Sequence, residues 1–452
     1  MVFYRLSLSR TIVENDINEF VQQVIPYVKN CGCVCIKFCQ WLTPVFDLLY
    51  NEEGNEPHWL KTLETLYENC PNHSLRYTFN QYKEDFDKSL SDTYDIVDII
   101  GSGSIGQVYK IQHKLSNKLF AMKVLHPNVH YDMWFFRYII NLLLRIPYTN
   151  QIIYNVLPYD IPKYLDLFEE QLNMIHEANN LCQMYYNYKD NEYINIPTLV
   201  SFSSSILLMS YEGGTTLDDI DISEYEKMKL VTILSLFAKH NFEIVNFNHG
   251  DVHKGNWKVG SYNDGYRLNI YDFGFCWSAE NILISELTSE SFSDTNKDDY
   301  SKLTRLTAEL LNDTSDSMVN YINNYIINNL SDNNVTDPKF TFTSICAIAK
   351  QKGLVIDPIS IQGILIYIQT YKYWTKYGLN NKNENWETDR NIYRSDYLNS
   401  YSLCQTYDIF PEVQLWFKDK LNNKQEEVTE LFDMLDESNN ITDEVRGLLK
   451  FD

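Results

Sequence analysis

The sequence predicts an α+β protein with two lobes, a small antiparallel sheet followed by a helical lobe, and a helical extension in front of both. Two observations carry this prediction. Three short β-like runs lie between residues 94 and 125, whereas the first 90 residues and the chain after about residue 285 show helical patterns. We expect four segments: a helical extension at 1–92, a sheet lobe at 93–213, a helical lobe at 214–385 and an acidic helical tail at 386–452.

The helical extension is predicted from apolar residues that recur with the helical period. Phe20, Val24 and Val28 share one face of a helical pattern within residues 11–50. Residues 57–66 and 75–90 continue the extension as further helical pieces.

The sheet lobe begins where the period changes. Residues 94–100, 108–112 and 119–125 have the apolar and β-branched composition of strands, and Gly101-Ser102-Gly103-Ser104 separates the first two. We therefore predict a small antiparallel sheet from these three runs.

After the three strands the pattern becomes mainly helical. Residues 165–186 and 230–245 keep a helical period, and residues 206–209 form a short buried strand between them. Residues 256–259 and 266–271 are predicted to pair as a hairpin, because an Asn-Asp-Gly turn separates them.

The charge and the cysteine content exclude several classes of protein. The formal net charge of −23 repels phosphate backbones, so we expect no nucleic-acid partner. Nine cysteines in 452 residues do not make a disulfide framework, and the odd number indicates a reducing compartment. Four cysteines crowd together without a second pair at zinc-finger spacing, and we interpret them as reduced thiols: Cys31, Cys33, Cys35 and Cys39.

The sequence carries no membrane or secretion signal that we recognise. No uninterrupted apolar run reaches the roughly 18 residues of a membrane span. The first ten residues lack the apolar core of a secretory peptide. We therefore expect a protein without a transmembrane segment that is not secreted and works in the cytoplasm or an organelle.

Lys123 stands inside the apolar strand predicted at residues 119–125, where a lysine has to reach water or pair with a carboxylate. For the strand alone, an edge-strand lysine that reaches water is an equally good interpretation. Glu177 lies among apolar residues of a predicted helix and in turn needs a cation. Pairing them satisfies both groups and aims the ammonium at nucleotide phosphates, as in kinases. We therefore assign Lys123 and Glu177 to a catalytic site.

The string His249-Gly250-Asp251-Val252-His253-Lys254-Gly255-Asn256 has the D-x-x-x-x-N spacing of a kinase catalytic loop. In this interpretation Asp251 orients or deprotonates an acceptor hydroxyl, and Asn256 binds Mg²⁺. Asp272, in the Asp272-Phe273-Gly274 string one hairpin later, is the second metal ligand. Singly, Asp251 could cap a turn and Asn256 could hold a loop, but their order and spacing favour chemistry.

A glycine-rich stretch lies between the first two predicted strands, where glycines let backbone N–H groups approach phosphates. Alone it could be only a flexible hairpin, but Lys123 follows Gln107 by sixteen residues, as in a kinase sheet lobe. We therefore predict an ATP site. The candidate nucleotide contacts are Gly101, Gly103, Ser104, Gly106, Gln107, Lys123, Met209 and Tyr211.

Together these motifs resemble the UbiB/ADCK family of atypical kinases. Residues 104–108 are similar to its A-A-A-S-I-[AG]-Q-V nucleotide loop, residues 249–256 to its H-A-D-x-H-P-G-N loop and residues 177–180 to its E-A-x-N helix. Lys37-Phe38-Cys39-Gln40 resembles its K-x-G-Q motif, which lies in an added helical segment that ordinary protein kinases lack. The resemblance covers roughly residues 30–280 and implies that Lys37 and Gln40 face the triphosphate.

This chain departs from the family pattern at several positions. Cys39 replaces the glycine of K-x-G-Q, and Gln171 and Asn173 replace the two acids of an E-x-D pair. Any metal or lysine contact made by those acids is weakened here. The alanine-rich part of the nucleotide loop is Gly101-Ser102-Gly103, which is closer to an ordinary kinase loop. No A-P-E-like segment follows Asp272, which fits the family and argues against ordinary docking of protein substrates.

The resemblance implies a two-lobed protein-kinase-like fold and an atypical kinase or ATPase that uses ATP and Mg²⁺. It also implies a link to isoprenoid-lipid (ubiquinone) metabolism and a mitochondrial setting, and it leaves a small-molecule or lipid acceptor and peripheral membrane contact open. Two alternatives remain. One is a small-molecule kinase of the aminoglycoside or choline kinase type, because Gly250 matches the glycine of the H-G-D loop in those kinases. The other is a non-catalytic nucleotide-binding scaffold. Residues 37–40 favour the first interpretation, because those small-molecule kinases lack such an element.

Overall fold

The computed structural model describes residues 14–50, 57–66, 72–263, 265–279, 300–329 and 338–366, together with Tyr373 and Tyr377. These residues fall into two compact units. The first unit contains the described residues up to 221, residues 247–278 and residues 342–366; the second contains the described residues in between and the two tyrosines. Every residue assigned to the site from the sequence lies in the first unit. The four segment boundaries drawn from the sequence stay predictions.

The first unit contains a five-stranded antiparallel sheet. Its spatial order is β1 (Tyr94–Ser102), β2 (Gly106–His113), β3 (Leu119–Leu125), β6 (Ile206–Ser210) and β5 (Leu199–Phe202). The three strands predicted between residues 94 and 125 and the strand at 206–209 are confirmed. Strand β5, which pairs with β6 at the sheet edge, was not predicted.

The two faces of this sheet have different partners, because side chains alternate along each strand. One face forms an apolar core: Tyr82, Leu90, Tyr109, Ile111, Met122, Val124, Ile206 and Leu208. The opposite face carries Ala121 and Lys123 of β3. The register pairs Lys123 with Val108 of β2 and Leu207 of β6. Alternation therefore places a lysine in the middle of the sheet on the side away from the core.

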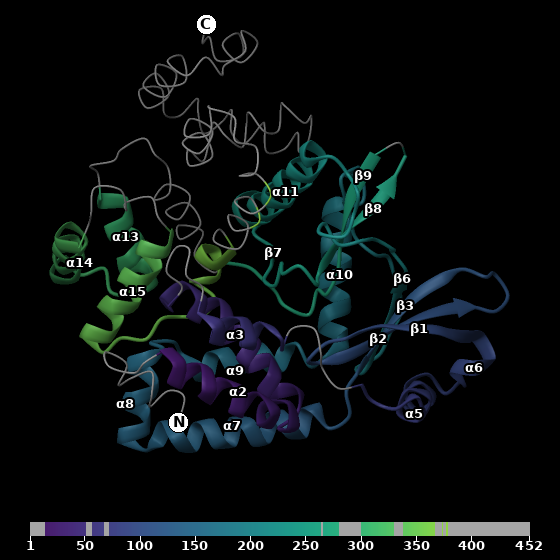
Figure 1. The fold of residues 1–452 in the computed structure, drawn as a ribbon, viewed down its shortest axis with the longest axis horizontal. Helices are drawn as coiled ribbons and strands as arrows, with labels where there is room; N and C mark the ends of the chain where they lie inside the picture. The colour runs from purple at the N-terminus through teal and green to yellow at the C-terminus, as the bar shows by residue number, and fades with distance from the viewer. Residues whose placement is uncertain are drawn as a thin grey trace, which may run out of the picture. The chain divides into compact units, whose positions relative to one another are not determined.

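Helices α5 (Leu75–Phe86) and α6 (Leu90–Thr93) supply Tyr82 and Leu90 to the core. Ser74 caps α5, and Asp87 ends it in the left-handed region with φ of +53°, so the helix predicted at 75–90 is two pieces. Figure 1 shows α5 and α6 near β1 and β2, and α10 (Met174–Tyr188) beside β6.

The single helix predicted at residues 165–186 is wrong, because the chain breaks there into α9 (Ile161–Glu170) and α10. The side-chain oxygen of Asn173 accepts a hydrogen bond of 3.0 Å from the Ile175 N–H and caps α10. An apolar pattern that continues through the break does not reveal such a cap. The break turns α10 so that it packs on β5 and β6.

In the described part of the first 66 residues the chain forms α2 (Glu14–Asn30), α3 (Cys33–Tyr50) and α4 (His58–Glu64). Gly32, with φ of +94°, makes the turn between α2 and α3. Two further helices, α7 (Val129–Arg145) and α8 (Pro147–Val156), were not predicted. Helix α3 packs on α7, which also contacts α9.

Short strands carry the segments that hold the chemistry. Strands β8 (Trp257–Tyr262) and β9 (Gly265–Ile270) form the predicted hairpin, and β4 (Ile194–Asn195) pairs with β9. Strand β7 (Asn248–His249) precedes that hairpin in the sequence and β10 (Cys276–Trp277) follows it, and the two strands pair antiparallel.

The second unit is helical in its described part. Helix α11 (Glu224–Lys239) starts six residues before the predicted 230–245 helix, because Ser223 caps it by accepting the Glu226 N–H. It continues as the π-helix η1 (His240–Val245). Helices α13 (Ser301–Leu310), α14 (Asp316–Asn329) and α15 (Pro338–Lys352) follow, and α15 belongs to the first unit from Phe342 onward.

The predicted acidic tail at 386–452 lies outside the described residues. Among the helices that the structure describes, none has both the length and the hydropathy required to cross a membrane.

Candidate functional site

Lys123 and Glu177 form the ion pair that the sequence predicts. Strand β3 and helix α10 bring Nζ of Lys123 to 2.8 and 2.9 Å from the two carboxylate oxygens of Glu177. The same ammonium lies 2.7 Å from Oδ1 of Asp272. The Glu177 side chain is 1% exposed and that of Asp272 is 42% exposed. Lys123 therefore forms ion pairs with the buried carboxylate of Glu177 and with the partly exposed carboxylate of Asp272.

The charges of this cluster are fixed by burial and by the neighbouring groups. Burial raises the pKa of Glu177 to about 7 although Lys123 opposes the shift. Burial also acts to raise the pKa of Asp272, but Lys123 and Lys37 outweigh it and lower that pKa. For Lys123, burial acts to lower the pKa, and the two carboxylates raise it above the usual lysine value. The lysine is charged, and Asp272 is ionised as a metal ligand has to be.

His249 ties the 249–256 loop to the end of β9. The Asp251 N–H donates to its Nδ1 at 3.2 Å, and its Nε2 lies 2.9 Å from the Tyr271 carbonyl oxygen. Because an N–H only donates and a carbonyl only accepts, the ring is the neutral tautomer that is protonated on Nε2. Burial supports this state, because it lowers the pKa of His249. A neutral histidine thus sets the spacing between Asp251 and the segment that precedes Asp272.

Asn256 closes the same loop. Its Nδ2 donates to the Asp251 carbonyl at 2.9 Å, and its own carbonyl accepts the Tyr271 N–H at 2.8 Å. Within the described part of the chain, Oδ1 of Asn256 and Oδ2 of Asp272 accept no hydrogen bond. Two oxygen atoms with available lone pairs, on adjacent segments, are the kind of donor set that fits Mg²⁺.

Asn180 is a site residue that we did not assign from the sequence. It lies three residues after Glu177 on α10, and its Nδ2 donates to the Phe273 carbonyl at 2.9 Å. Residues three apart on a helix share a face, so this spacing is the signal that could have identified it. Asp272 has φ of +58°, in a region that aspartate and asparagine tolerate better than most residues. The hydrogen bond from Asn180 therefore helps to fix the Asp272-Phe273 segment in this conformation.

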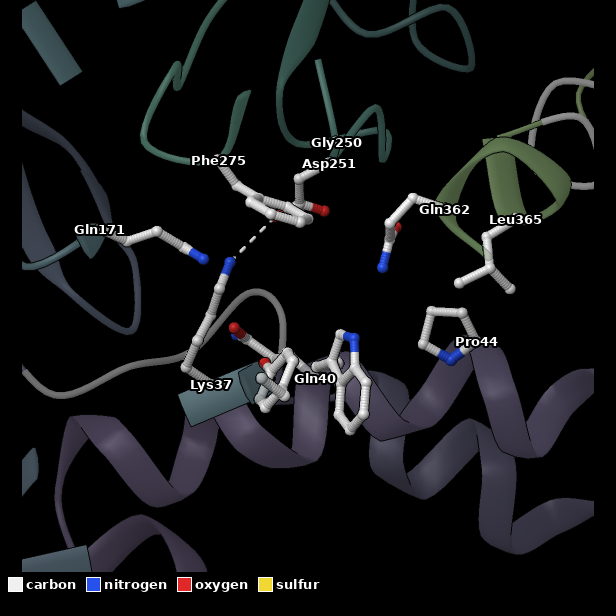
Figure 2. A pocket seen from close by; sticks show the side chains of 11 residues that line it. Lys37, Gln40, Pro44, Gln171, Gly250, Asp251, Phe275, Gln362 and Leu365 are labelled. Carbon is white, nitrogen blue, oxygen red and sulfur yellow. Dashed lines mark hydrogen bonds and ion pairs between the residues drawn. The ribbon is translucent and has the colours of Figure 1, made fainter. Parts of the chain in front are cut away.

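Lys37 of α3 contacts the 249–256 loop directly. Its Nζ lies 3.0 Å from Oδ2 of Asp251, the dashed contact in Figure 2. Burial acts to raise the pKa of Asp251, but Lys37 and His253 outweigh it and lower that pKa. Burial acts to lower the pKa of Lys37, and Asp251 raises it. Both groups are therefore ionised.

Gln40 lies one turn after Lys37 on α3 and lines the same cavity as Lys37 and Asp251. Its Nε2 donates to the Leu66 carbonyl at 2.8 Å, which ties α3 to the residues after α4. The orientation of Lys37 and Gln40 toward a triphosphate, which the resemblance implies, stays a prediction.

The glycine-rich stretch is the turn between β1 and β2. Gly101 lies in the last ladder pairs of β1, and the Gly103 N–H donates to the Gly106 carbonyl at 3.0 Å. Gly103 is exposed, whereas Ser104 is buried. A Cβ at Gly106 would lie 2.7 Å from the Val124 carbonyl oxygen, so glycine is required for β2 to approach β3 here.

Gln107 points into the protein. Its Oε1 accepts the His73 N–H at 2.9 Å, and its Nε2 donates to the Tyr109 hydroxyl at 2.8 Å. The amide thus joins the glycine-rich turn to the segment before α5. Its assignment to the nucleotide stays a prediction, and this inward orientation does not support it.

A chain of hydrogen bonds runs beneath the glycine-rich turn. The Tyr109 hydroxyl lies 2.6 Å from Oγ1 of Thr78, which lies 3.0 Å from Nε2 of His73. Nδ1 of His73 lies 2.9 Å from Nδ1 of His126, and Nε2 of His126 lies 3.0 Å from the Gly103 carbonyl. The chain therefore connects the core of the sheet to the exposed tip of the turn.

The direction of each hydrogen bond in this series follows from the Gly103 carbonyl at its end. Because the Gly103 carbonyl only accepts, His126 donates from Nε2, and its Nδ1 accepts the Nδ1–H of His73. Nε2 of His73 then accepts from Thr78, whose oxygen accepts from the Tyr109 hydroxyl. Both rings are neutral in this order. Burial agrees, because it lowers the pKa of His126 and, with His126 nearby, that of His73 to about 4.

Met209 and Tyr211 lie at and just beyond the end of β6. Met209 is opposite Ala121 of β3, so its side chain is on the face of the sheet that carries Lys123. The Lys110 ammonium lies 4.5 Å from the centre of the Tyr211 ring. One face of the sheet thus carries both Met209 and Lys123, and Lys123 contacts Glu177.

Comparison with known proteins identifies the family. Residues 65–307, more than half of the chain, match the model of the ABC1 atypical kinase-like domain. The chain belongs to the ABC1 atypical kinase-like family. The predicted resemblance to UbiB/ADCK proteins is thereby confirmed, and so is the α+β, kinase-like fold class.

Several curated ABC1 relatives are similar over about half of the chain. The mitochondrial ABC1 family protein C21C3.03 of Schizosaccharomyces pombe is 26% identical over 56% of this chain and 41% of its own length. The probable protein kinase UbiB of Photobacterium profundum is 26% identical over 51% of this chain and 43% of its own length. The chain thus spans about two fifths of the length of these relatives.

Two further proteins widen the comparison. The chloroplastic protein ACTIVITY OF BC1 COMPLEX KINASE 3 of Arabidopsis thaliana is 26% identical over 48% of this chain and 31% of its own length. A Mycobacterium tuberculosis protein solved in complex with erythromycin matches with a TM-score of 0.42 and 15% identity, over 65% of this chain and 82% of that one.

The departures from the ABC1 pattern have defined places in the structure. Gln171 is buried between α9 and α10 and lines the cavity beside Lys37, whereas Asn173 caps α10. Cys39 is in α3, where burial raises the pKa of its thiol to about 12. No described cysteine forms a disulfide, and no described group of three His, Cys, Asp or Glu residues is arranged to hold a metal.

Gly250, in place of the alanine that the resemblance predicts, is packed tightly in this ABC1 protein. Its N–H donates to the Phe275 carbonyl at 2.8 Å. A Cβ here would lie 2.5 Å from Cδ1 of Phe275 and 3.0 Å from Cδ1 of Trp277. The glycine lets the loop approach β10, and Phe275 fills the space that a methyl group would occupy.

Proposed function

We propose that this chain binds Mg-ATP and transfers or hydrolyses its γ-phosphoryl group, as an atypical kinase or ATPase. The observation that carries the proposal is the Lys123 ammonium, which lies 2.7 to 2.9 Å from carboxylate oxygens of Glu177 and Asp272. A lysine already fixed by a buried glutamate can contact phosphate oxygens without reorganisation of the site.

The other residues have complementary roles in this proposal. Asp251, which Lys37 keeps ionised, accepts the proton of an acceptor hydroxyl or of water. Asn256 and Asp272 would hold Mg²⁺, which when bound neutralises charge on the phosphate oxygens. The backbone N–H groups of the turn other than that of Gly103, which is bonded to the Gly106 carbonyl, contact phosphates.

Helix α3 favours this proposal over a small-molecule kinase of the aminoglycoside or choline kinase type. Those kinases have no element that corresponds to residues 37–40, whereas here Lys37 contacts Asp251. The same contact supports a second candidate, a nucleotide-binding scaffold, because it covers one oxygen of the carboxylate that has to accept a proton.

The cellular setting is also a proposal. Relatives named as mitochondrial and chloroplastic support an organelle with reducing conditions. A role in isoprenoid-lipid (ubiquinone) metabolism, with peripheral contact to a membrane, is what the family resemblance implies. Fractionation of cells that express a tagged chain tests the compartment.

The deciding experiment compares wild type with Asp251→Asn, a substitution that keeps size and removes charge. Thermal unfolding with and without Mg-ATP measures binding, and ADP release measures turnover. A kinase or ATPase is stabilised by Mg-ATP in both forms and loses ADP release in the variant. Equal, negligible ADP release with intact stabilisation favours the scaffold. If Mg-ATP does not stabilise the wild type, the proposal and its alternatives are wrong.

A further inference from the structure

A small cavity of about 50 Å³ lies beside Asp251, between α3, the turn before α10 and the segment that follows α15. Figure 2 shows the amides of Gln171 and Gln362 reaching toward it from opposite sides, with α3 below and Phe275 above. Its charged and amide side chains are one ion pair and three glutamines: Lys37, Asp251, Gln40, Gln171 and Gln362.

The lining carries no unpaired charge. Lys37 and Asp251 neutralise one another at 3.0 Å, and the three glutamines are uncharged. A charged ligand would enter this space without a counter-charge and would lose its hydration, which costs several kcal/mol. An uncharged ligand avoids that cost.

Two of the amides have hydrogen-bonding capacity left over. Gln362 is 5% exposed, and its side chain forms no hydrogen bond with a described residue. Gln171 is 4% exposed, and its amide makes one long contact of 3.4 Å, from Nε2 to the Leu167 carbonyl. Buried amides without partners are costly, so such groups usually face water or a ligand. A hydroxyl group, which both donates and accepts, satisfies either end of an amide.

The position of Gln362 is set by the fold. The segment before it is held by two backbone hydrogen bonds, from Ile356 to the Pro158 carbonyl at 2.7 Å and from Asp160 to the Ile356 carbonyl at 2.9 Å. An ion pair between Lys163 and Asp357 adds to this anchor. The amide is therefore presented to the cavity from an ordered support.

One wall of the cavity is aromatic. The rings of Trp41 and Tyr164 stack with 3.6 Å between their centroids and 23° between their planes. A rigid aromatic wall packs well against the carbon skeleton of a ligand whose hydroxyl groups face the amides. With about 10–15 Å³ needed for each water-sized group, the space holds roughly four of them.

We propose that this cavity is the acceptor subsite of the proposed phosphotransferase and takes the hydroxyl-bearing end of an uncharged alcohol or polyol. The inference rests on the proposed function. In the transfer, the acceptor oxygen forms a bond to the γ-phosphorus while its proton passes to Asp251. The bond between the γ-phosphorus and the β,γ-bridging oxygen breaks, and ADP leaves with that electron pair.

The test uses the full chain with Mg-ATP and three classes of probe. Glycerol and myo-inositol represent uncharged polyols, ethanolamine and choline represent cationic alcohols, and D-glycerate represents anionic ones. ADP release and mass-spectrometric detection of a phosphomonoester measure transfer. Mg-ATP affinity and ADP release without a probe are measured separately. Absent nucleotide binding, or ADP release that Asp251→Asn does not reduce, would contradict the proposed function, whereas failure of the acceptor class alone leaves both intact.

We expect an uncharged polyol to stimulate ADP release and to be phosphorylated. The variants Gln362→Leu and Gln171→Leu should each raise the KM for that polyol about tenfold, the cost of one lost hydrogen bond in a buried site, with the Mg-ATP Kd within about twofold. Gln183→Leu, on the exposed side of α10, is the matched control and should keep the wild-type KM.

A charge variant keeps the test decisive if a leucine variant fails to fold. Gln362→Glu adds a negative charge to the cavity and should shift the preference toward ethanolamine and choline. Stimulation of wild type by charged probes only, by none of the probes, or to the same degree in the Gln362 and Gln171 variants would overturn the proposal.

Discussion

His73 and His126 face one another through their Nδ1 atoms at 2.9 Å, and the order of protons around them requires both rings to be neutral. The contact joins the segment before α5 to the strand end that supports the Gly103 carbonyl. A proton added to His126 would place an N–H on each side of this 2.9 Å contact. The glycine-rich turn thus depends on the protonation state of two histidines.

The first prediction is that mild acid destabilises the protein through His73. The pKa of His73 is about 4 in the folded protein, below its usual value of 6.5, so between those values the unfolded chain binds more protons. Stability should therefore be lost as the pH falls through this window. With allowance for its partial exposure, we expect His73 to contribute a loss of about 1 kcal/mol between pH 7.5 and pH 5.

Urea unfolding at the two pH values measures this loss. His73→Gln keeps a donor and an acceptor but does not titrate, so its free energy of unfolding should change less with pH than that of wild type. His58→Gln, at an exposed position at the start of α4, is the control. Equal pH dependence in wild type and His73→Gln would contradict the prediction.

The second prediction separates the two roles of Lys123. Lys123→Met leaves the buried Glu177 carboxylate without its cation and should lower the free energy of unfolding by about 3 kcal/mol. It should also abolish stabilisation by Mg-ATP. The double variant Lys123→Met/Glu177→Leu should recover much of the stability without recovering nucleotide binding, because an apolar pair replaces a buried ion pair at little cost.

Thermal and urea unfolding with and without Mg-ATP test both parts. Lys118→Met, at an exposed turn between β2 and β3, controls for the loss of a lysine. Nucleotide binding by the double variant would show that the ammonium is not a phosphate contact.

The third prediction concerns Asp272. Asp272→Asn keeps the side-chain shape, and asparagine tolerates the φ of +58° found here, so the fold should survive. Loss of the charge should raise the Mg²⁺ concentration needed for half-maximal stabilisation by ATP about tenfold or more. Asp87→Asn is a matched control, because Asp87 also has a positive φ, of +53°, but is exposed at the end of α5. An unchanged Mg²⁺ requirement in Asp272→Asn would exclude Asp272 as a ligand.

Much of this site could be predicted because its chemistry lies in short strings. Asp251, Asn256 and Asp272 lie within 22 residues of one another, so their spacing can be read from the sequence. A lysine within an apolar strand, such as Lys123, is equally easy to recognise. The family model confirms the kinase-like class that these strings indicate.

Contacts between distant residues could not be predicted in the same way. The pair Lys37–Asp251 joins residues 214 apart, and the contact from His73 to Gln107 joins residues 34 apart. Gln107 belongs to a nucleotide-loop string, yet its amide is used inside the protein. The break before α10 depends on one side-chain cap at Asn173 within a continuous apolar pattern. The local sequence pattern indicates that a helix or strand forms. Caps such as Asn173 and contacts with distant residues decide where it ends and what it packs against.

The fourth prediction is that Gly250→Ala is destabilising. Its new methyl group would meet the Phe275 ring at 2.5 Å, and rigid rings yield only by moving the backbone, so we expect a loss of about 1–3 kcal/mol. Combination with Phe275→Leu should restore part of this loss. Gly265→Ala is the control, because the nearest atom to its Cβ would be 3.9 Å away. Equal effects of the two alanine substitutions in urea unfolding would contradict tight packing at Gly250.

The fifth prediction concerns the pH dependence of turnover. A proton acceptor has to be ionised, and Lys37 lowers the pKa of Asp251, so wild-type turnover should persist into mildly acidic solution. Lys37→Met removes that stabilisation of the carboxylate, the pKa of Asp251 rises, and the acid limb of the kcat profile should move to higher pH. Lys88→Met, which removes an exposed lysine after α5, should leave the limb in place. An acid limb at the same pH in wild type and Lys37→Met would mean that Lys37 holds α3 in place without lowering the pKa of Asp251.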